Sequence, residues 1–530
     1  MTSSRLSIVI AAICAVTQQA RADQPNVVFF LVDDLGWSDV GCFGSEFYET
    51  PNIDRLADEG VRFTDAYAAC HVCSPTRASI LTGKYPARLG LSDWIPGRRD
   101  FAFQRLKNVP NLQQLPLDEV TLAEALSQAG YSTGHFGKWH LGENEYGPQH
   151  QGFAVHAPQN WYKGWPRAGY KAPFQFDGLP DKPGDYLTDR LTDEAFRFID
   201  ANQDTPFFLY LSHFAVHDPI QGRPDLVAKY SEKLAGRRQI ETPAFILEGN
   251  PDDPNPFTRR QLNDLIDRPS FAQFGVLPGR TVKIKQRQDN VEFAAMVESV
   301  DESLGRITQR LKELSLEEKT IVIFFADNGG MAGMNVGNPQ RTISWQALDV
   351  AYSTANLPLR GAKGWLYEGG IRVPCIVKWP GQTQTGLVSH EPIISNDFYP
   401  SILEMAGLPP RTSQTVDGIS LVPALRGHSL ERDAICWHFP HYSNHGMQSP
   451  GGAIREGDYK LIEYFENDTV QLFDLKNDVG ERNNLAAVLP EKAETLRRKL
   501  QVWRNEVGAR MMEPNPEYNP DTYPRGAKQR

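Results

Sequence analysis

The sequence predicts an α/β protein with one large domain and one smaller domain. Unbroken apolar runs at residues 27–32, 206–211 and 321–326 have the composition of strands buried in a parallel sheet. Helical periodicity follows at 122–130 and over a longer stretch at 291–314. The chain has 530 residues, and domains beyond about 250–300 residues usually split, so a second core is expected.

Composition limits the partners that bulk charge could recruit. The formal net charge is −10 at pH 7, which argues against non-specific nucleic-acid binding. No block of like charges forms a polybasic or acidic tail. Nucleic acid is therefore not an expected partner.

The N-terminal residues 1–22 have the pattern of a secretory signal peptide. Arg5 precedes an apolar run at 6–16, and Ala20-Arg21-Ala22 resembles a cleavage site before Asp23. The run is shorter than the roughly 18 residues that a membrane span needs, so no stable membrane insertion is expected. The mature protein is expected to be exported, to the periplasm or beyond the cell.

Export would permit disulfides. Cys14 is lost with the signal peptide, and Cys73 has another expected role. The remaining cysteines allow three pairings or free buried thiols, and the sequence does not choose among them: Cys42, Cys70, Cys375 and Cys436.

Acidic residues follow two of the apolar runs. Asp33 and Asp34 end the run at 27–32, and Asp327 and Asn328 end the run at 321–326. Ligands bind at the carboxyl ends of strands in open α/β sheets, and adjacent buried carboxylates need a cation between them. The oxygen donors predict a site for a hard divalent cation, calcium or magnesium.

The segment Cys73-Ser74-Pro75-Thr76-Arg77 predicts a helix that begins at its cysteine. Pro75 suits a first helical turn, and residues 78–81 continue the helix. Backbone N–H groups at a helix start attract an anion, and Arg77 lies one turn on, on the same face as Cys73. We expect an anion pocket with Arg77 as a positive fork.

With Leu81-Thr82-Gly83 after it, this segment resembles the signature of type I sulfatases, the arylsulfatase-like branch of the alkaline phosphatase superfamily. The resemblance implies that a maturation enzyme oxidises Cys73 to formylglycine, whose hydrate is the nucleophile. It also implies a calcium ion, or alternatively magnesium, on the set Asp33, Asp34, Cys73, Asp327 and Asn328.

The resemblance refines the fold expectation. It implies a large mixed central sheet sandwiched by helices, as in alkaline phosphatase and the sulfatases, and a smaller domain of antiparallel sheet plus helix. We expect the catalytic domain at 23–430, the C-terminal subdomain at 431–512 and a loosely attached tail at 513–530. Residues 453–462 and 470–475 are predicted as strands, and 491–507 as a helix.

Two basic residues occur in Gly137-Lys138-Trp139-His140-Leu141-Gly142. In an extended segment Lys138 and His140 would project to the same side and reach one anion. The string closely matches the family, where the lysine binds the sulfate and the histidine deprotonates the formylglycine hydrate.

Two more candidates come later in the chain. His217 follows the apolar run at 206–211 and resembles the family's proton donor to the leaving group. Lys363 would bring another cation to the pocket, and the family uses the matching lysine on the sulfate and the leaving oxygen. Glu368 and Arg372, beside a Gly-Gly pair, are expected to be structural.

The chemistry follows from the charge of a sulfate ester. A nucleophile must approach sulfur past negative oxygens, so preorganised positive charge from a metal and from Arg77, Lys138 and Lys363 is expected to dominate catalysis. One hydroxyl of the hydrate would attack and form a sulfo-enzyme intermediate while His217 protonates the leaving oxygen. His140 would then deprotonate the second hydroxyl, and sulfate would leave.

Substrate expectations come from long segments between the matched motifs, at 94–114, 150–180 and 221–287, which we expect at the rim of the cleft. Aromatic and basic residues cluster at 160–166 and 437–442, which favours a sulfated carbohydrate over a small aryl sulfate ester. The alternative is that these aromatics pack the domain interface.

Two other functions remain open from the sequence. Related enzymes with the same nucleophile and metal site are phosphodiesterases or phosphonate monoester hydrolases. A protein in which Cys73 is never converted could instead bind sulfated glycans without cleaving them.

Overall fold

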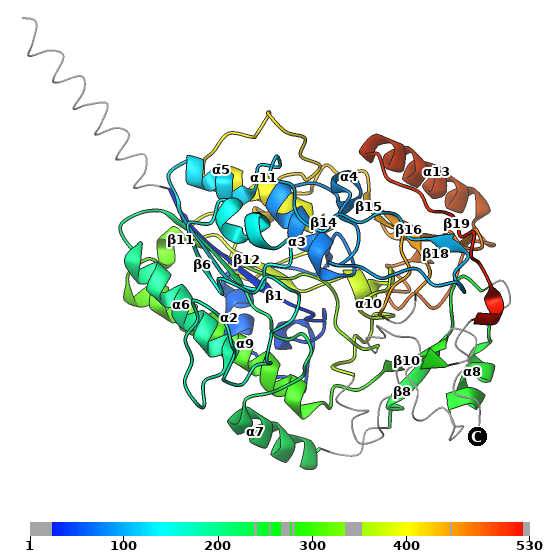
Figure 1. The fold of residues 1–530 in the computed structure, drawn as a ribbon, viewed down its shortest axis with the longest axis horizontal. Helices are drawn as coiled ribbons and strands as arrows, with labels where there is room; N and C mark the ends of the chain where they lie inside the picture. The colour runs from blue at the N-terminus through cyan, green and yellow to red at the C-terminus, as the bar shows by residue number, and fades with distance from the viewer. Residues whose placement is uncertain are drawn as a thin grey trace, which may run out of the picture.

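The computed structural model describes residues 24–237, 241–253, 256–266, 276–277, 281–333, 352–445 and 448–522. The predicted signal peptide at 1–22 lies outside these residues. Figure 1 shows a large sheet enclosed by helices and, beside it, a smaller sheet covered by the helix α13 (Pro490–Val507). The predicted division into a large α/β layer structure and a smaller C-terminal unit of sheet plus helix is confirmed.

The central sheet has eight strands and is mixed. The strands from β11 to β6 are parallel, while β12 runs antiparallel to both of its neighbours. All side chains of β1 and β11 are buried, which explains their unbroken apolar sequences. The strand order is β13 (Leu387–Ser389), β2 (Val61–Phe63), β12 (Cys375–Lys378), β11 (Thr320–Ala326), β1 (Asn26–Val32), β7 (Phe207–Ser212), β5 (Ser132–Gly137) and β6 (Val155–Ala157).

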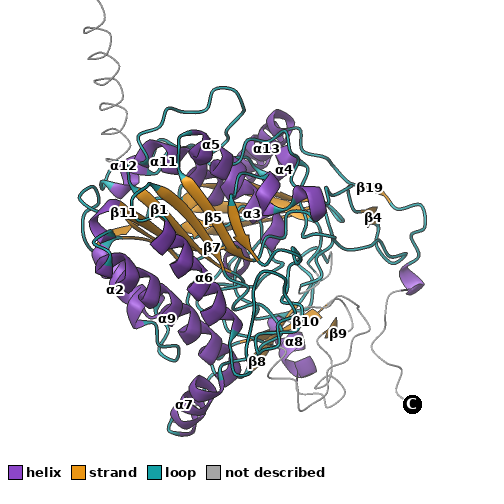
Figure 2. Cartoon of the chain, turned by 60° about the vertical axis from the view of Figure 1, so that its left-hand side comes forward, coloured by secondary structure: helices purple, strands orange, loops and turns teal. Residues whose placement is uncertain are grey.

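Helices cover both faces of this sheet (Figure 2). One layer contains α2 (Pro51–Glu59), α6 (Leu187–Ala201) and α9 (Val291–Glu313), with α7 (Pro224–Ala235) packed on α9. The other layer contains α3 (Cys73–Thr82), α5 (Leu122–Gln128) and α11 (Phe398–Met405). Besides α13, the other α-helices that the structure describes are α4 (Pro86–Leu89), α8 (Arg259–Ile266), α10 (Glu368–Ile371) and α12 (Val422–Leu425).

Smaller sheets complete the described fold. The C-terminal sheet is antiparallel, with β15 (Ile435–Phe439), β16 (Gly451–Glu456), β17 (Tyr459–Tyr464) and β18 (Thr469–Asp474) in that order. The others are β8 (Phe245–Glu248) with β10 (Thr281–Lys285) and β9 (Val276–Leu277), β14 (Ile393–Ile394) with β3 (Ala66–Tyr67), and β19 (Glu513–Pro514) with β4 (Leu106–Lys107).

Two details of the C-terminal region differ from expectation. The strand predicted at 453–462 is a hairpin of β16 and β17, because Gly457 turns the chain with a φ of +58°. The tail predicted to be loose at 513–530 is anchored at its start, because β19 pairs with β4 and Asn515 donates to the Gln104 carbonyl at 2.9 Å.

Buried charges join the C-terminal sheet to the large domain. Lys460 on β17 lies 2.8 Å from Glu368 and 2.9 Å from Glu481, and all three side chains are buried. Glu368 also accepts a hydrogen bond from the Tyr67 hydroxyl at 2.8 Å. Arg372 lies 3.3 Å from Glu368. Because these partners come from both parts of the chain, Glu368 and Arg372 have the structural surroundings expected for them.

The buried carboxyl group of Asp39 should make the stability of the protein depend on pH. Asp39, in the loop after β1, accepts hydrogen bonds from the Gly36 N–H at 2.8 Å and the Thr354 hydroxyl at 2.5 Å. Burial nevertheless raises its pKa from 3.8 to about 7. The folded protein thus binds this proton more tightly than the unfolded chain, so the free energy of unfolding should fall as pH rises from about 4 to 7. Denaturant unfolding at several pH values gives the slope of the free energy of unfolding against pH. In Asp39→Asn this slope should be smaller by the equivalent of up to one proton. An unchanged slope would contradict the raised pKa of Asp39.

Candidate active site

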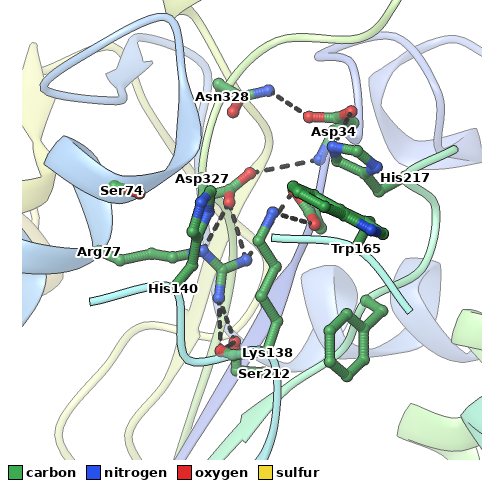
Figure 3. A network of polar contacts seen from close by, with 12 residues as sticks. Asp34, Ser74, Arg77, Lys138, His140, Trp165, Ser212, His217, Asp327 and Asn328 are labelled. Atoms are coloured by element: carbon green, nitrogen blue, oxygen red, sulfur yellow. Dashed lines mark hydrogen bonds and ion pairs between the residues drawn. The ribbon is translucent and has the colours of Figure 1, made fainter. Parts of the chain in front are cut away.

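Strand register brings the predicted metal ligands together. Val32 pairs with Ala326, so Asp33 and Asp34 leave β1 beside Asp327 and Asn328, which leave β11. The Asp34 N–H donates to Asp327 Oδ1 at 3.2 Å, and Asn328 Nδ2 donates to Asp34 Oδ1 at 2.8 Å (Figure 3). All four side chains are buried at one edge of the sheet.

The donor set fits a hard cation. Carboxylate oxygens of Asp33, Asp34 and Asp327 lie within 4.8 Å of one another. Asp33 Oδ1 and Asn328 Oδ1 are buried and accept no hydrogen bond from the described residues. Burial and repulsion from Asp327 raise the pKa of Asp33 to about 7, so the cluster calls for added positive charge. These oxygen atoms could hold calcium or magnesium.

Three buried cations surround the acidic cluster, each next to a different carboxylate. Lys138 Nζ lies 2.5 Å from Asp33 Oδ2, and Lys363 Nζ lies 2.6 Å from Asp34 Oδ1. Arg77 Nη2 lies 2.8 Å from Asp327 Oδ2. Burial opposes ionisation of Asp34, but Lys363 prevails and lowers the pKa of that carboxyl below its usual value. The positive charge therefore converges where the sequence predicted it.

The Arg77 guanidinium, which was expected to bind an anion, is hydrogen-bonded to protein groups. Its Nε donates to Asp327 at 2.8 Å, and its Nη1 donates to the Lys138 carbonyl at 2.8 Å and to Ser212 Oγ at 2.5 Å. Ser212, at the end of β7, was not singled out from the sequence, because a lone serine after an apolar run carries no distinctive pattern. Arg77 thus orients Asp327 and the Lys138 backbone.

We expect Arg77→Lys to destabilise the protein strongly. A lysine cannot reproduce the planar fork, and breaking a buried pair typically costs about 3–5 kcal/mol. Urea unfolding measures the loss. Arg88→Lys is the matched control, because Arg88 also pairs with one carboxylate, Asp417 at 2.7 Å, but is 27% exposed and should lose about 1 kcal/mol or less. Equal losses in the two variants would contradict the structural role of Arg77.

The predicted nucleophile lies at the start of α3, as expected. Cys73 is 2% exposed, and its Sγ lies within 4.8 Å of donor atoms of Asp33 and His217. Burial raises the pKa of the Cys73 thiol above 9.0, despite Lys138 and Lys363. The unmodified side chain is therefore a neutral thiol at pH 7 and a weak nucleophile.

His217 has the surroundings of a proton donor. Its Nδ1 donates to the Asp218 carbonyl at 2.8 Å, and its Nε2 lies 3.7 Å from Asp34 Oδ2. Burial and Lys363 disfavour its charged form, but Asp34, Asp218 and Asp33 prevail and raise the pKa of His217 above 6.5. Asp218 had no role assigned from the sequence, although it directly follows the histidine.

Lys138 and His140 do not share an extended segment, contrary to expectation. β5 ends at Gly137, where the φ is +111° and a Cβ would lie 1.9 Å from the Ser212 carbonyl oxygen; His140 also has a positive φ, of 58°. His140 Nε2 lies 2.6 Å from the Ile95 carbonyl oxygen, which only accepts, so Nε2 carries the proton. Burial and Lys138 lower the pKa of His140 well below 6.5. Its buried Nδ1 is left as a proton acceptor.

A pocket of about 420 Å³ opens beside His140. The predicted rim segments 94–114 and 150–180 supply Gln114, Tyr162, Lys163 and Trp165 to its lining. Trp165 is 39% exposed and lines the same pocket as His140; both are labelled in Figure 3. The aromatic cluster at 160–166 is therefore at the pocket.

The second aromatic cluster, at 437–442, packs between the domains, which was the alternative. Trp437 is buried and donates from Nε1 to the Ala68 carbonyl at 2.9 Å.

The described cysteines are all unpaired: Cys42, Cys70, Cys73, Cys375 and Cys436. Among the described residues, no helix combines the length and apolar character needed to cross a bilayer.

The chain is similar to known protein families and to individual proteins. The family described as Sulfatase matches residues 25–408, and the family described as N-sulphoglucosamine sulphohydrolase, C-terminal, matches residues 362–506. A Sulfatase of Formosa agariphila is 29% identical over 92% of this chain and 90% of its own length. Arylsulfatase A of Homo sapiens is 30% identical over 92% of this chain and 89% of its own length.

A solved structure is also similar. Ps i-CgsB, which has been crystallised alone and with k-i-k-neocarrahexaose, is 26% identical and superposes with a TM-score of 0.66 over 91% of this chain and 93% of its own. The Sulfatase family match covers more than half of the chain, and the relatives and the solved structure are similar over about nine tenths of it. The chain belongs to the sulfatase family, type I enzymes of the alkaline phosphatase superfamily that hydrolyse sulfate esters.

Proposed function

We propose that the protein hydrolyses sulfate monoesters of carbohydrates, with residue 73 as formylglycine and its hydrate as the nucleophile. The observation that carries the proposal is the convergence of Lys138, Lys363 and the acidic cluster on Cys73 at one sheet edge. The neutral, buried thiol of Cys73 supports a requirement for modification, since a thiol in that state would attack slowly. A formylglycine-generating enzyme is the partner that this step requires.

Sulfate binding would use the positive groups. Asp33, Asp34, Asp327 and Asn328 would hold calcium, or alternatively magnesium, with residue 73 completing the set. The bound cation would supply positive charge against the sulfate oxygens. Lys138 and Lys363 would face the same anion, and Arg77 would keep Asp327 and Lys138 in place. This preorganised charge stabilises the transition state.

Proton transfer would use the two histidines. One hydroxyl of the hydrate releases its proton to water and attacks sulfur, the bond from sulfur to the sugar oxygen breaks, and His217, assisted by Lys363, protonates that oxygen. Residue 73 then carries the sulfate. His140 Nδ1 accepts the proton of the remaining hydroxyl, the carbon–oxygen bond to sulfate breaks, and the aldehyde forms again. Water adds to the aldehyde and restores the hydrate.

A sugar would occupy the pocket beside His140. Trp165 offers an exposed aromatic face, and Lys163, whose Nζ lies 5.7 Å from the Trp161 ring centre, offers a cation at the rim. Ps i-CgsB with its bound k-i-k-neocarrahexaose supports a carbohydrate for this chain as well. The pattern at residues 1–22 supports export, and an exported enzyme would meet extracellular polysaccharides.

The test is to co-express the protein with a formylglycine-generating enzyme and to examine the tryptic peptide 63–77 by mass spectrometry. Conversion of Cys73 with sulfate release from sulfated sugars is the expected result. Faster hydrolysis of a phosphodiester or phosphonate monoester would overturn the choice of substrate. Binding of sulfated sugar without cleavage, with an intact thiol, would favour the glycan-binding function instead.

A further inference from the structure

A turn from the C-terminal unit reaches the active site. His445, six residues after the end of β15, packs against Gly364, which directly follows Lys363. A Cβ placed on Gly364 would lie 2.3 Å from the Cβ of His445. On its other side Gly364 donates its N–H to the His71 carbonyl at 3.0 Å, two residues before Cys73. His445 is therefore placed next to two segments that carry proposed catalytic groups.

Hydrogen bonds hold this turn in place. Arg98 Nη1 donates to the Ser443 carbonyl at 2.8 Å, and Ser443 Oγ donates to the His445 carbonyl at 3.0 Å. The Leu366 N–H donates to Gln448 Oε1 at 2.5 Å. The backbone at His445 is thus fixed from both domains, which lets its side chain act as a preorganised group.

Within the residues that the structure describes, the His445 ring has no hydrogen-bond partner. The residue is 5% exposed, its Nδ1 is fully buried, and neither ring nitrogen makes a hydrogen bond within the described part of the chain. Two other buried histidines of the same unit each bond through Nε2, His438 to the Arg510 carbonyl and His441 to Ser92 Oγ, both at 2.8 Å. A buried imidazole without a partner is costly unless a ligand supplies one.

The charges around His445 belong to the leaving-group end of the site. Burial first, and then Lys363, lower the pKa of His445 well below 6.5, while Asp34 and Asp218 act in the opposite direction. His217 also lies within electrostatic reach. The ring is therefore neutral at pH 7, with one N–H donor and one acceptor. The unprotonated ring nitrogen can accept a hydrogen bond from a hydroxyl, whereas a sulfate offers no proton to it.

We propose that His445 is a substrate-positioning residue, which hydrogen bonds a hydroxyl of the leaving sugar beside the sulfated carbon. This role rests on the proposed sulfated-carbohydrate activity and adds a contact from the C-terminal unit. His445 would orient the sugar so that its ester oxygen faces His217. An aryl sulfate has no hydroxyl at that place and would gain nothing from His445.

The test compares two substrates of the matured enzyme, the best of a panel of sulfated monosaccharides and 4-nitrophenyl sulfate. Loss of a buried hydrogen bond typically costs 1–3 kcal/mol, so His445→Ala should lower kcat/KM for the sugar by about 10- to 100-fold. It should change kcat/KM for 4-nitrophenyl sulfate by less than about threefold, since that contact is absent. His445→Gln keeps a donor and an acceptor and should restore part of the loss on the sugar.

His438→Ala is the matched control, because it removes another buried imidazole of the same unit and should affect both substrates alike. Equal losses of the two activities in His445→Ala, or no loss of either, would overturn the positioning role. If the wild-type protein releases no sulfate from either substrate, the proposed function fails on its own. Calorimetric titration with the sulfated sugar then still decides the role of His445, which equal Kd values for wild type and His445→Ala would overturn.

Discussion

Cys73→Ala should abolish sulfate release while leaving the protein folded. Alanine cannot be oxidised to an aldehyde, so the variant has no hydrate to attack sulfur. Removal of a nucleophile from an enzyme that works through a covalent intermediate typically lowers kcat by about 10⁴- to 10⁶-fold. The measurement is sulfate release at saturating substrate, together with thermal unfolding to confirm the fold.

Cys42→Ala is the control, because Cys42 is an unpaired cysteine that contacts neither the acidic cluster nor the pocket among the described residues. It should keep nearly full activity. Cys73→Ser tests the modification separately, since a serine that the maturation enzyme does not oxidise should be almost as inactive as alanine. Substantial turnover by Cys73→Ala would show that residue 73 is not the nucleophile.

Removal of divalent metal should eliminate activity and lower stability. Three buried carboxylates lie within 4.8 Å of one another, and burial, followed by repulsion from Asp327, raises the pKa of Asp33. A cation that binds only the folded state at 100 times its Kd stabilises that state by about 2.7 kcal/mol. We expect dialysis against a chelator to abolish sulfate release, and calcium to restore both activity and the free energy of unfolding.

Two variants separate this effect from general destabilisation. Asp34→Ala should lose the calcium-dependent rise in stability. Asp301→Ala removes another buried carboxylate, one that accepts from the Ile53 N–H at 2.8 Å on α2, and should be less stable but still respond to calcium. A chelated wild-type protein with full activity would contradict the metal assignment, and a larger response to magnesium would change only the identity of the ion.

Much of the central sheet was predictable because burial on both faces gives its central strands unbroken apolar sequences. β1 and β11 are buried on both faces, so their sequences are apolar without interruption, and the acids at their ends mark where the ligand site begins. β15 was not predicted as a strand, because its sequence also reads as a cluster of aromatic and basic residues. The turn at Gly457 was missed because the flanking sequence continues the strand pattern.

Some residues of the site were likewise predictable from the sequence, and others were not. Cys73, Arg77 and the metal ligands lie in short strings whose spacing follows from one helix or two strand ends. The placement of His140 depends on the positive φ angles at Gly137 and His140, which periodicity cannot reveal. His445 carries no local pattern at all, and only the contact between the C-terminal turn and Gly364 brings it to the site.

The burial of α3 has a consequence for the order of events in the life of the protein. All ten residues of this helix are buried, including Cys73 at its start, which is 2% exposed. An enzyme that modifies Cys73 must hold this segment in its own active site, which the packed helix does not allow. If Cys73 is oxidised as we propose, that modification would have to precede folding, and a molecule that folds first would keep an unconverted thiol.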